Sequence, residues 1–127
     1  MRIVLIDDDH DDCELFSETV KALNADAHCS TFQNSPEAID LLLSGTISPD
    51  IIFLDVNMPR MNGRECLHSI KADSQLKVIP VVMYSTSNDP KEIKYFMSLG
   101  ASYVSKPNTI EELARLLEPF LSKQTVL

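Results

Sequence analysis

Acidic, hydroxyl and amine side chains stand at the ends of four short apolar runs of this sequence. They are Asp7 and Asp8, Asp55, Ser85 and Lys106. Carboxylates held close together repel one another, and a hard divalent cation between them would remove that repulsion. Mg²⁺ prefers carboxylate, carbonyl and water oxygens, and it can leave positions open for a phosphoryl group. If these side chains meet, they favour transfer of a phosphoryl group to an aspartate, assisted by a lysine and a hydroxyl.

Five β-branched or apolar runs alternate with stretches whose apolar residues recur at helical spacing. The predicted strands are 2–6, 27–32, 50–54, 78–84 and 102–105, and the predicted helices begin near Asp12, near Ser35, after Gly63, at Asp89-Pro90 and at Thr109. This alternation is typical of βα units and of an α/β fold with a parallel sheet. Ligands bind outside the carboxyl ends of such strands, so we expect the side chains named above to converge at one edge.

Several local features carry simpler interpretations. We interpret Asp9, Asp11 and Asp12 as the solvent-facing start of the first helix. We expect Ser35 to cap the second helix, and Met97 to lie on a buried face of the fourth. Pro119 lies inside the last helical pattern, where it predicts a kink or an early end of that helix.

Bulk composition limits the classes of protein that this chain can be. Its 127 residues and 44% apolar content are those of one globular domain, with a core of about 1–122 and a frayed tail over 123–127. The net charge of −8 argues against nucleic-acid binding. The apolar runs are too short to span a membrane, and the start of the chain does not resemble a signal peptide. Three widely spaced cysteines fit a reducing compartment, so we expect the cytoplasm.

Six short motifs together resemble a known family. They are Ile6-Asp7-Asp8, Leu54-Asp55, Met58-Pro59, Asn62-Gly63, Tyr84-Ser85-Thr86 and Lys106-Pro107. Their order and spacing over the whole chain resemble bacterial response-regulator receiver domains. The resemblance implies a flavodoxin-like (βα)5 fold, with a five-stranded parallel sheet in the order 2-1-3-4-5 and helices on both faces.

The same resemblance implies a metal and phosphate site. Asp55 matches the phosphorylated aspartate, and Asp8 matches a direct ligand of Mg²⁺. Asp7 matches a neighbouring acid that acts through water, and Asn57 matches the position whose backbone carbonyl binds the metal. Lys106 matches the lysine that assists phosphotransfer.

The resemblance also implies a conformational switch. Ser85 matches the switch hydroxyl and Tyr103 the aromatic residue whose rotamer reports activation. The segment from Gly100 to Tyr103 is one residue shorter than the family's usual pattern. The Lys106–Pro107 peptide bond is expected to be cis.

By this resemblance the chain would be a stand-alone response regulator, not an enzyme in the usual sense. A sensor histidine kinase or a histidine phosphotransfer protein would phosphorylate Asp55, and the signal would pass to a downstream protein target. A homodimer is a further expected assembly. With no further sequence for an output domain, the output would be a protein–protein contact. One alternative is a receiver-like interaction module that never uses phosphate. Another is a phosphate-ester hydrolase of the haloacid dehalogenase type, but Asp55-Val56-Asn57 lacks the second acid of the required Asp-x-Asp.

Overall fold

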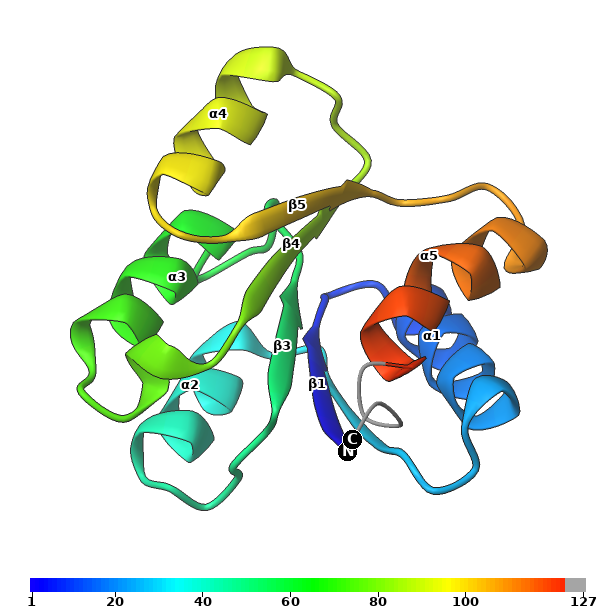
Figure 1. The fold of residues 1–127 in the computed structure, drawn as a ribbon. Helices are drawn as coiled ribbons and strands as arrows, with labels where there is room; N and C mark the ends of the chain where they lie inside the picture. Colours follow the sequence, from blue (N-terminus) through cyan, green and yellow to red (C-terminus); the bar gives the residue numbers. More distant parts are fainter. Residues whose placement is uncertain (123–127) are drawn as a thin grey trace.

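A parallel five-stranded sheet forms the centre of the molecule. The computed structural model describes residues 1–122, so the predicted frayed tail, 123–127, lies outside the described residues. The strands are β1 (Arg2–Ile6), β2 (His28–Phe32), β3 (Ile51–Leu54), β4 (Val81–Ser85) and β5 (Ser102–Ser105), and their order is β2-β1-β3-β4-β5 (Figure 1). The α/β fold class, the flavodoxin-like order 2-1-3-4-5 and the parallel pairing predicted from the sequence are confirmed.

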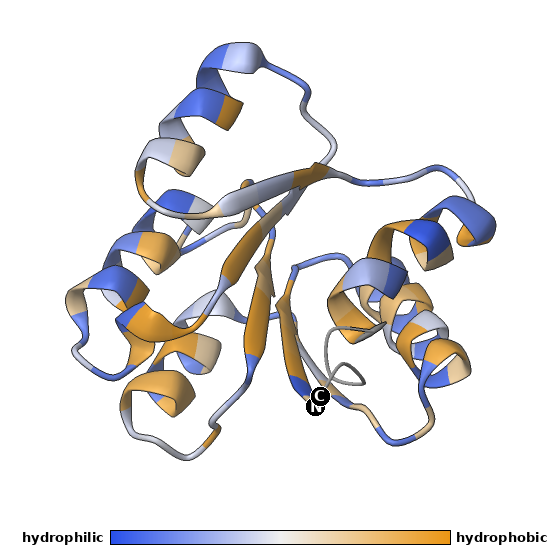
Figure 2. Cartoon of the chain, viewed as in Figure 1, coloured by the Kyte–Doolittle hydropathy of each residue, from blue (hydrophilic) through white to orange (hydrophobic). Residues whose placement is uncertain are grey.

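Helices cover both faces of this sheet. They are α1 (His10–Leu23), α2 (Ser35–Leu43), α3 (Gly63–Ala72), α4 (Pro90–Ser98) and α5 (Ile110–Ser122), with the short 3₁₀ helix η1 (Leu76–Val78) before β4. Figure 1 shows α1 and α5 on one face of the sheet and α2, α3 and α4 on the other. Figure 2 shows apolar residues concentrated in the central strands and on the helix surfaces that face them.

Two apolar cores result, one on each face of the sheet. On the α1 and α5 face, Phe53 packs edge-to-face against Phe16 at a centroid distance of 5.0 Å and against Phe120 at 5.4 Å. On the other face, Leu54 and Met83 pack with side chains of α2, α3 and α4. All four residues of β3 are buried, as expected for a parallel strand covered on both faces.

Several predictions about element boundaries and about burial were wrong. Helix α2 is capped by Asn34, whose side chain accepts a hydrogen bond from the Glu37 amide, and the Ser35 hydroxyl instead donates to the Met61 carbonyl at 2.6 Å. Strand β4 begins at Val81 because residues Leu76–Val78 form η1, in which Val78 is 75% exposed. Met97 is 59% exposed and does not lie on a buried face of α4.

The predicted early end of the last helix at Pro119 and the predicted cis bond at Pro107 were wrong, whereas a kink at Pro119 stays a prediction. Helix α5 continues through Pro119 to Ser122 instead of ending early. Burial of Leu113, Leu117 and Leu121 along one side of α5 offsets the roughly 3 kcal/mol that a helical proline costs. No described peptide bond is cis, so the Lys106–Pro107 bond is trans. The trans form is the lower-energy isomer, by about 0.5–1 kcal/mol for an X–Pro bond.

Candidate functional site

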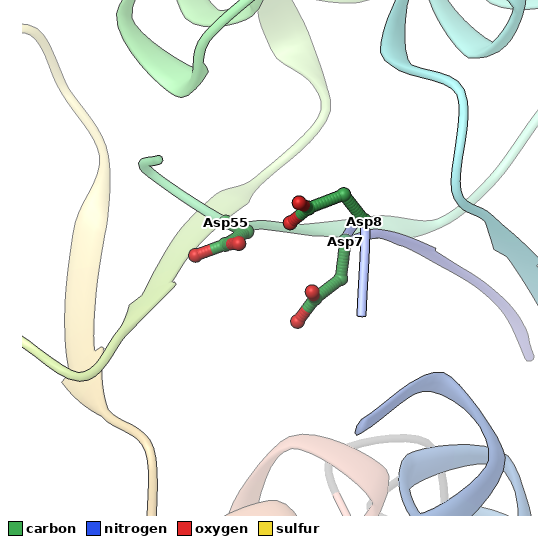
Figure 3. Close-up of side chains that lie close together, drawn as sticks. All are labelled: Asp7, Asp8 and Asp55. Carbon is green, nitrogen blue, oxygen red and sulfur yellow. The ribbon is translucent and has the colours of Figure 1, made fainter. Parts of the chain in front are cut away.

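Asp7, Asp8 and Asp55 meet at the carboxyl edge of the sheet, as the sequence predicted. The parallel register pairs Ile6 with Leu54, which places the residues after them side by side, and the Asp55 amide donates to the Ile6 carbonyl at 2.9 Å. One carboxylate oxygen from each of the three aspartates lies within 4.8 Å of the others. Figure 3 shows the three side chains gathered at the ends of their strands.

The loop after β3 fixes the position of Asp55. The Gly63 amide donates to the Val56 carbonyl at 2.8 Å, and a Cβ atom on Gly63 would lie only 2.3 Å from the Asp55 carbonyl oxygen. Only glycine therefore allows α3 to begin so close to the strand. Asn62 and Glu65 form a reciprocal capping box at this helix start. The Val56 amide donates to Oδ1 of the Asp55 side chain at 2.9 Å.

Lys106 enters the same site from the end of β5. Its backbone amide donates to the Ser85 carbonyl at 2.7 Å, which continues the pairing of β4 with β5. Its Nζ atom lies 2.8 Å from Asp7 Oδ2, 2.9 Å from Asp12 Oδ2 and 3.6 Å from Asp55 Oδ1. One ammonium therefore serves three carboxylates, of which Asp55 is the most distant.

Burial and mutual repulsion disturb the ionisation of this cluster. Burial, followed by the nearby charge of Asp7, raises the pKa of Asp55 from 3.8 to about 7. Burial also raises the pKa of Asp7, although Lys106 opposes that change. The pKa of Lys106 is raised because its bonds to Asp7 and Asp12 outweigh its own burial. With one ammonium among four carboxylates, the site is short of positive charge.

A hard divalent cation fits the donor set of the aspartates. All three offer oxygen ligands, which Mg²⁺ prefers. Asp7 Oδ2 is fully buried, and among the described residues it has an ion-pair contact with Lys106 Nζ at 2.8 Å but no hydrogen bond of good geometry. Buried carboxylate oxygens left in this condition are costly, and a cation or its bound water would satisfy them.

The remaining predicted site residues lie nearby but differ in their surroundings. Asn57 is exposed in the loop two residues beyond Asp55. Ser85 is 1% exposed, and its hydroxyl accepts a hydrogen bond from the Ser87 amide at 3.1 Å. Tyr103 is half-buried, and its hydroxyl donates to the Ser87 carbonyl at 3.0 Å or to Glu92 Oε2 at 2.9 Å. Ser85 and Tyr103 therefore both contact Ser87, which precedes α4.

The interpretation of the acidic loop was correct for Asp9 and Asp11 but incomplete for Asp12, which begins α1 with its side chain 38% exposed. Asp9 caps α1 by accepting from the Asp12 amide, and Asp11 is exposed. The Asp12 carboxylate also accepts a hydrogen bond from Lys106, 94 positions along the chain. Helical spacing could have predicted that Asp12 faces the protein, because it lies one turn before the buried Phe16 and two turns before the buried Val20.

The fold and this edge of the sheet define a class of signalling domain. The profile described as "Response regulator receiver domain" matches residues 3–118. The chain therefore belongs to the response-regulator receiver family of two-component signalling, as its motifs predicted. Among the described residues, no helix has the length and apolar character needed to cross a bilayer.

Individual relatives agree with this assignment. Response regulator Rcp1 of Synechocystis is 28% identical over 122 residues, covering 91% of this chain and 83% of Rcp1. Two-component response regulator ARR12 of Arabidopsis thaliana is 30% identical over 117 residues, and the match covers 91% of this chain but only 19% of ARR12. This chain thus spans about a fifth of the length of ARR12.

Solved structures of receivers share the fold. The Mn²⁺-bound form of Rcp1 has a TM-score of 0.84 and 28% identity, covering 95% of this chain and 91% of that one. The phosphorylated cyanobacterial phytochrome response regulator RcpA has a TM-score of 0.86 and 28% identity, and the match covers 98% of this chain and 94% of RcpA.

Proposed function

We propose that Asp55 accepts a phosphoryl group in a Mg²⁺-dependent reaction, from a sensor histidine kinase or a histidine phosphotransfer protein. The observation that carries this proposal is the convergence of Asp7, Asp8 and Asp55, with Lys106 Nζ 3.6 Å from Asp55 Oδ1. The Mn²⁺-bound and phosphorylated states of the two similar structures support it.

The residues divide the work by their positions. Asp7, Asp8 and Asp55, together with the backbone carbonyl of Asn57, would hold Mg²⁺. When bound, Mg²⁺ neutralises charge on the carboxylates and on the phosphoryl oxygens. An ionised Asp55 oxygen forms a bond to phosphorus as the bond from phosphorus to the donor's histidine nitrogen breaks, which leaves an acyl phosphate. Lys106 balances the charge on the transferred group.

The chain then acts as a switch and not as a metabolic enzyme. The Ser85 hydroxyl turns from the Ser87 amide to a phosphoryl oxygen, and Tyr103 changes its contacts with Ser87 and Glu92. Helix α4 and the loop before it respond, because Ser87 and Glu92 belong to them. Such a switch requires two states that differ in affinity for the phosphoryl group. A downstream protein target, or a second copy of the chain in a homodimer, recognises the changed surface.

We also propose that residues 1–127 form a single receiver domain that works in the cytoplasm. One domain profile covers residues 3–118 without interruption, which supports the first part. The net charge of −8 fits protein partners better than nucleic acid.

Mass spectrometry after incubation with acetyl phosphate and Mg²⁺ tests the proposal. We expect one added phosphoryl group that hydroxylamine removes, and none in Asp55→Asn or in the presence of EDTA. Asp9→Asn is the matched control, because asparagine still caps α1 while one neighbouring charge is removed. Equal labelling of wild type and Asp55→Asn would refute Asp55 as the acceptor. No labelling of the wild type would favour the phosphate-independent interaction module.

A further inference from the structure

Lys106 is held unequally by the carboxylates around it. The Nζ atom is close to Asp7 and Asp12, at 2.8 and 2.9 Å, and farther from Asp55, at 3.6 Å. The side chains of Asp7, Asp55 and Lys106 are 0%, 9% and 10% exposed, whereas that of Asp12 is 38% exposed. Of these three carboxylates, that of Asp12 therefore has the greatest access to water.

We propose that Asp12 is a positioning residue that holds Lys106 toward α1 before phosphorylation and releases it when Asp55 carries a phosphoryl group. This inference rests on the function proposed above and assigns one further residue to it. Asp12 competes with Asp55 for the same ammonium, so it sets how readily Lys106 becomes available to the phosphoryl group.

The geometry explains why Asp12, and not Asp7, releases the lysine. Asp7 is fully buried at the end of β1, so separating it from Lys106 would leave an unpaired charge in the protein interior, which is costly. The Asp12 carboxylate can exchange the lysine for water at little cost, as exposed partners of ion pairs do. The acyl phosphate carries up to about two negative charges where the ionised Asp55 carboxylate carried one. That added charge attracts the ammonium away from its exposed partner.

The position of Asp12 is itself fixed by α1. Its backbone amide donates to the capping carboxylate of Asp9 at 3.0 Å, and Phe16 anchors the next turn of the helix in the core. The carboxylate of Asp12 thus starts from a defined place at the edge of the site. Asp11 occupies the same helical turn, is exposed and carries the same charge, which makes it a matched control.

The test compares Asp12→Asn with Asp11→Asn and with the conservative variant Asp12→Glu. Phosphorylation by acetyl phosphate is followed by mass spectrometry at saturating Mg²⁺ and constant ionic strength. We expect Asp12→Asn to be phosphorylated about threefold to fivefold faster than Asp11→Asn, the factor that loss of a partly exposed ion pair supplies. Asp12→Glu, which keeps the carboxylate, should remain near the wild-type rate.

A second measurement needs no phosphodonor. In metal-free ¹⁵N-labelled protein, the side-chain ammonium resonance of Lys106 should shift in Asp12→Asn but not in Asp11→Asn. The Mg²⁺ dissociation constant, measured by calorimetry, should be the same in these two variants within about twofold, since Asp12 is not a ligand. A tenfold or greater loss of Mg²⁺ affinity in Asp12→Asn would instead make Asp12 part of the metal site and overturn the proposal.

The proposal and the proposed function fail in different ways. If the wild type is labelled at Asp55 and Asp12→Asn behaves like Asp11→Asn in both rate and Lys106 resonance, the positioning role of Asp12 is refuted while the function stands. If the wild type is not labelled at all, the proposed function is refuted, and the positioning role with it.

Discussion

The interior of β3 and the residue that follows it differ in their surroundings: apolar side chains surround the strand, whereas like charges surround the residue after it. Within the strand, Ile51–Leu54 are buried among apolar side chains of both cores. One residue later, Asp55 is 7% exposed, lies beside Asp7 and has a pKa raised to about 7. The interior of the strand thus stabilises the fold. The carboxylates at its end repel one another, which lowers stability in the absence of a cation but favours binding of one. Substitutions in the two regions should therefore change stability in opposite directions.

The largest effect is expected from the strand interior. Phe53→Ala should lower the free energy of unfolding by about 3–5 kcal/mol, because it removes a fully buried ring and leaves a cavity. Urea denaturation followed by far-UV circular dichroism measures this loss. It should be independent of Mg²⁺, since Phe53 points to the α1 and α5 core. A loss below 1 kcal/mol would mean that this core can collapse around the cavity.

Asp55→Asn should increase stability in metal-free protein, the opposite of the effect of Phe53→Ala. At pH 8 the charge is removed from a buried, repulsive setting, so we expect the free energy of unfolding to rise on the order of 2–4 kcal/mol. Urea denaturation in EDTA measures the difference between the variant and the wild type. A variant less stable than wild type under these conditions would contradict the comparison.

The pH dependence follows from the same pKa. In the unfolded chain Asp55 loses its proton near pH 4, whereas in the folded protein it keeps the proton to about pH 7. Between these values the folded state binds more protons, so its stability falls as the pH rises. The difference in the free energy of unfolding between Asp55→Asn and wild type should therefore be small at pH 4, increase up to about pH 7 and then stay constant. A difference that is constant over this range would refute the raised pKa.

Mg²⁺ should remove the destabilising effect of the carboxylate cluster by neutralising its charge. At a tenfold excess over its dissociation constant, a ligand bound only by the native state adds about 1.4 kcal/mol. We expect this increment in wild type and its loss in Asp8→Asn, with Asp11→Asn as the control that keeps it. Thermal denaturation with and without Mg²⁺ provides the measurement. Equal increments in all three proteins would show that the cation binds elsewhere.

The smallest effect is expected at the helix start beside the site. Asn62→Ala removes the capping box of α3 and should cost about 1 kcal/mol of stability. Asn62→Asp, which keeps a capping oxygen, should cost much less. Urea denaturation compares the two, and an equal loss in both would show that the amide group contributes something other than the cap.

Short-range patterns predicted the α/β class and the meeting of Asp7, Asp8 and Asp55, whereas the strand order was predicted from the family resemblance. The strand ends at Asp7, Asp55, Ser85 and Lys106 follow from apolar runs that stop abruptly, and parallel pairing brings their ends together. The roles assigned to Asn57, Tyr103 and the other site residues remain predictions. What could not be predicted depended on tertiary contacts: the burial of α5 carries it through Pro119, and the rotation of α1 turns Asp12 toward Lys106.

Errors at boundaries have similar causes. Both Asn34 and Ser35 are good capping residues, and the choice between them is made by the Met61 carbonyl, which binds the Ser35 hydroxyl. Val78 has the β-branched side chain of a strand residue, yet it lies in η1. The first hydrogen bond between the following segment and β3 runs from the Ile52 amide to the Pro80 carbonyl, at 3.0 Å. Local propensity was insufficient at these positions because distant groups decided the outcome.

The contact between Gly63 and Asp55 makes any displacement at the site one-sided. The start of α3 lies directly behind the Asp55 backbone, with no space even for a methyl group between them. A group added to Asp55 therefore cannot be accommodated by a recoil of the residue toward α3. Helix α4, which lies on the same face of the sheet as α3, has one buried residue, Phe96. Because the Asp55 backbone packs tightly against the start of α3 while α4 has one buried side chain, we expect phosphorylation of Asp55 to displace α4 more than α3.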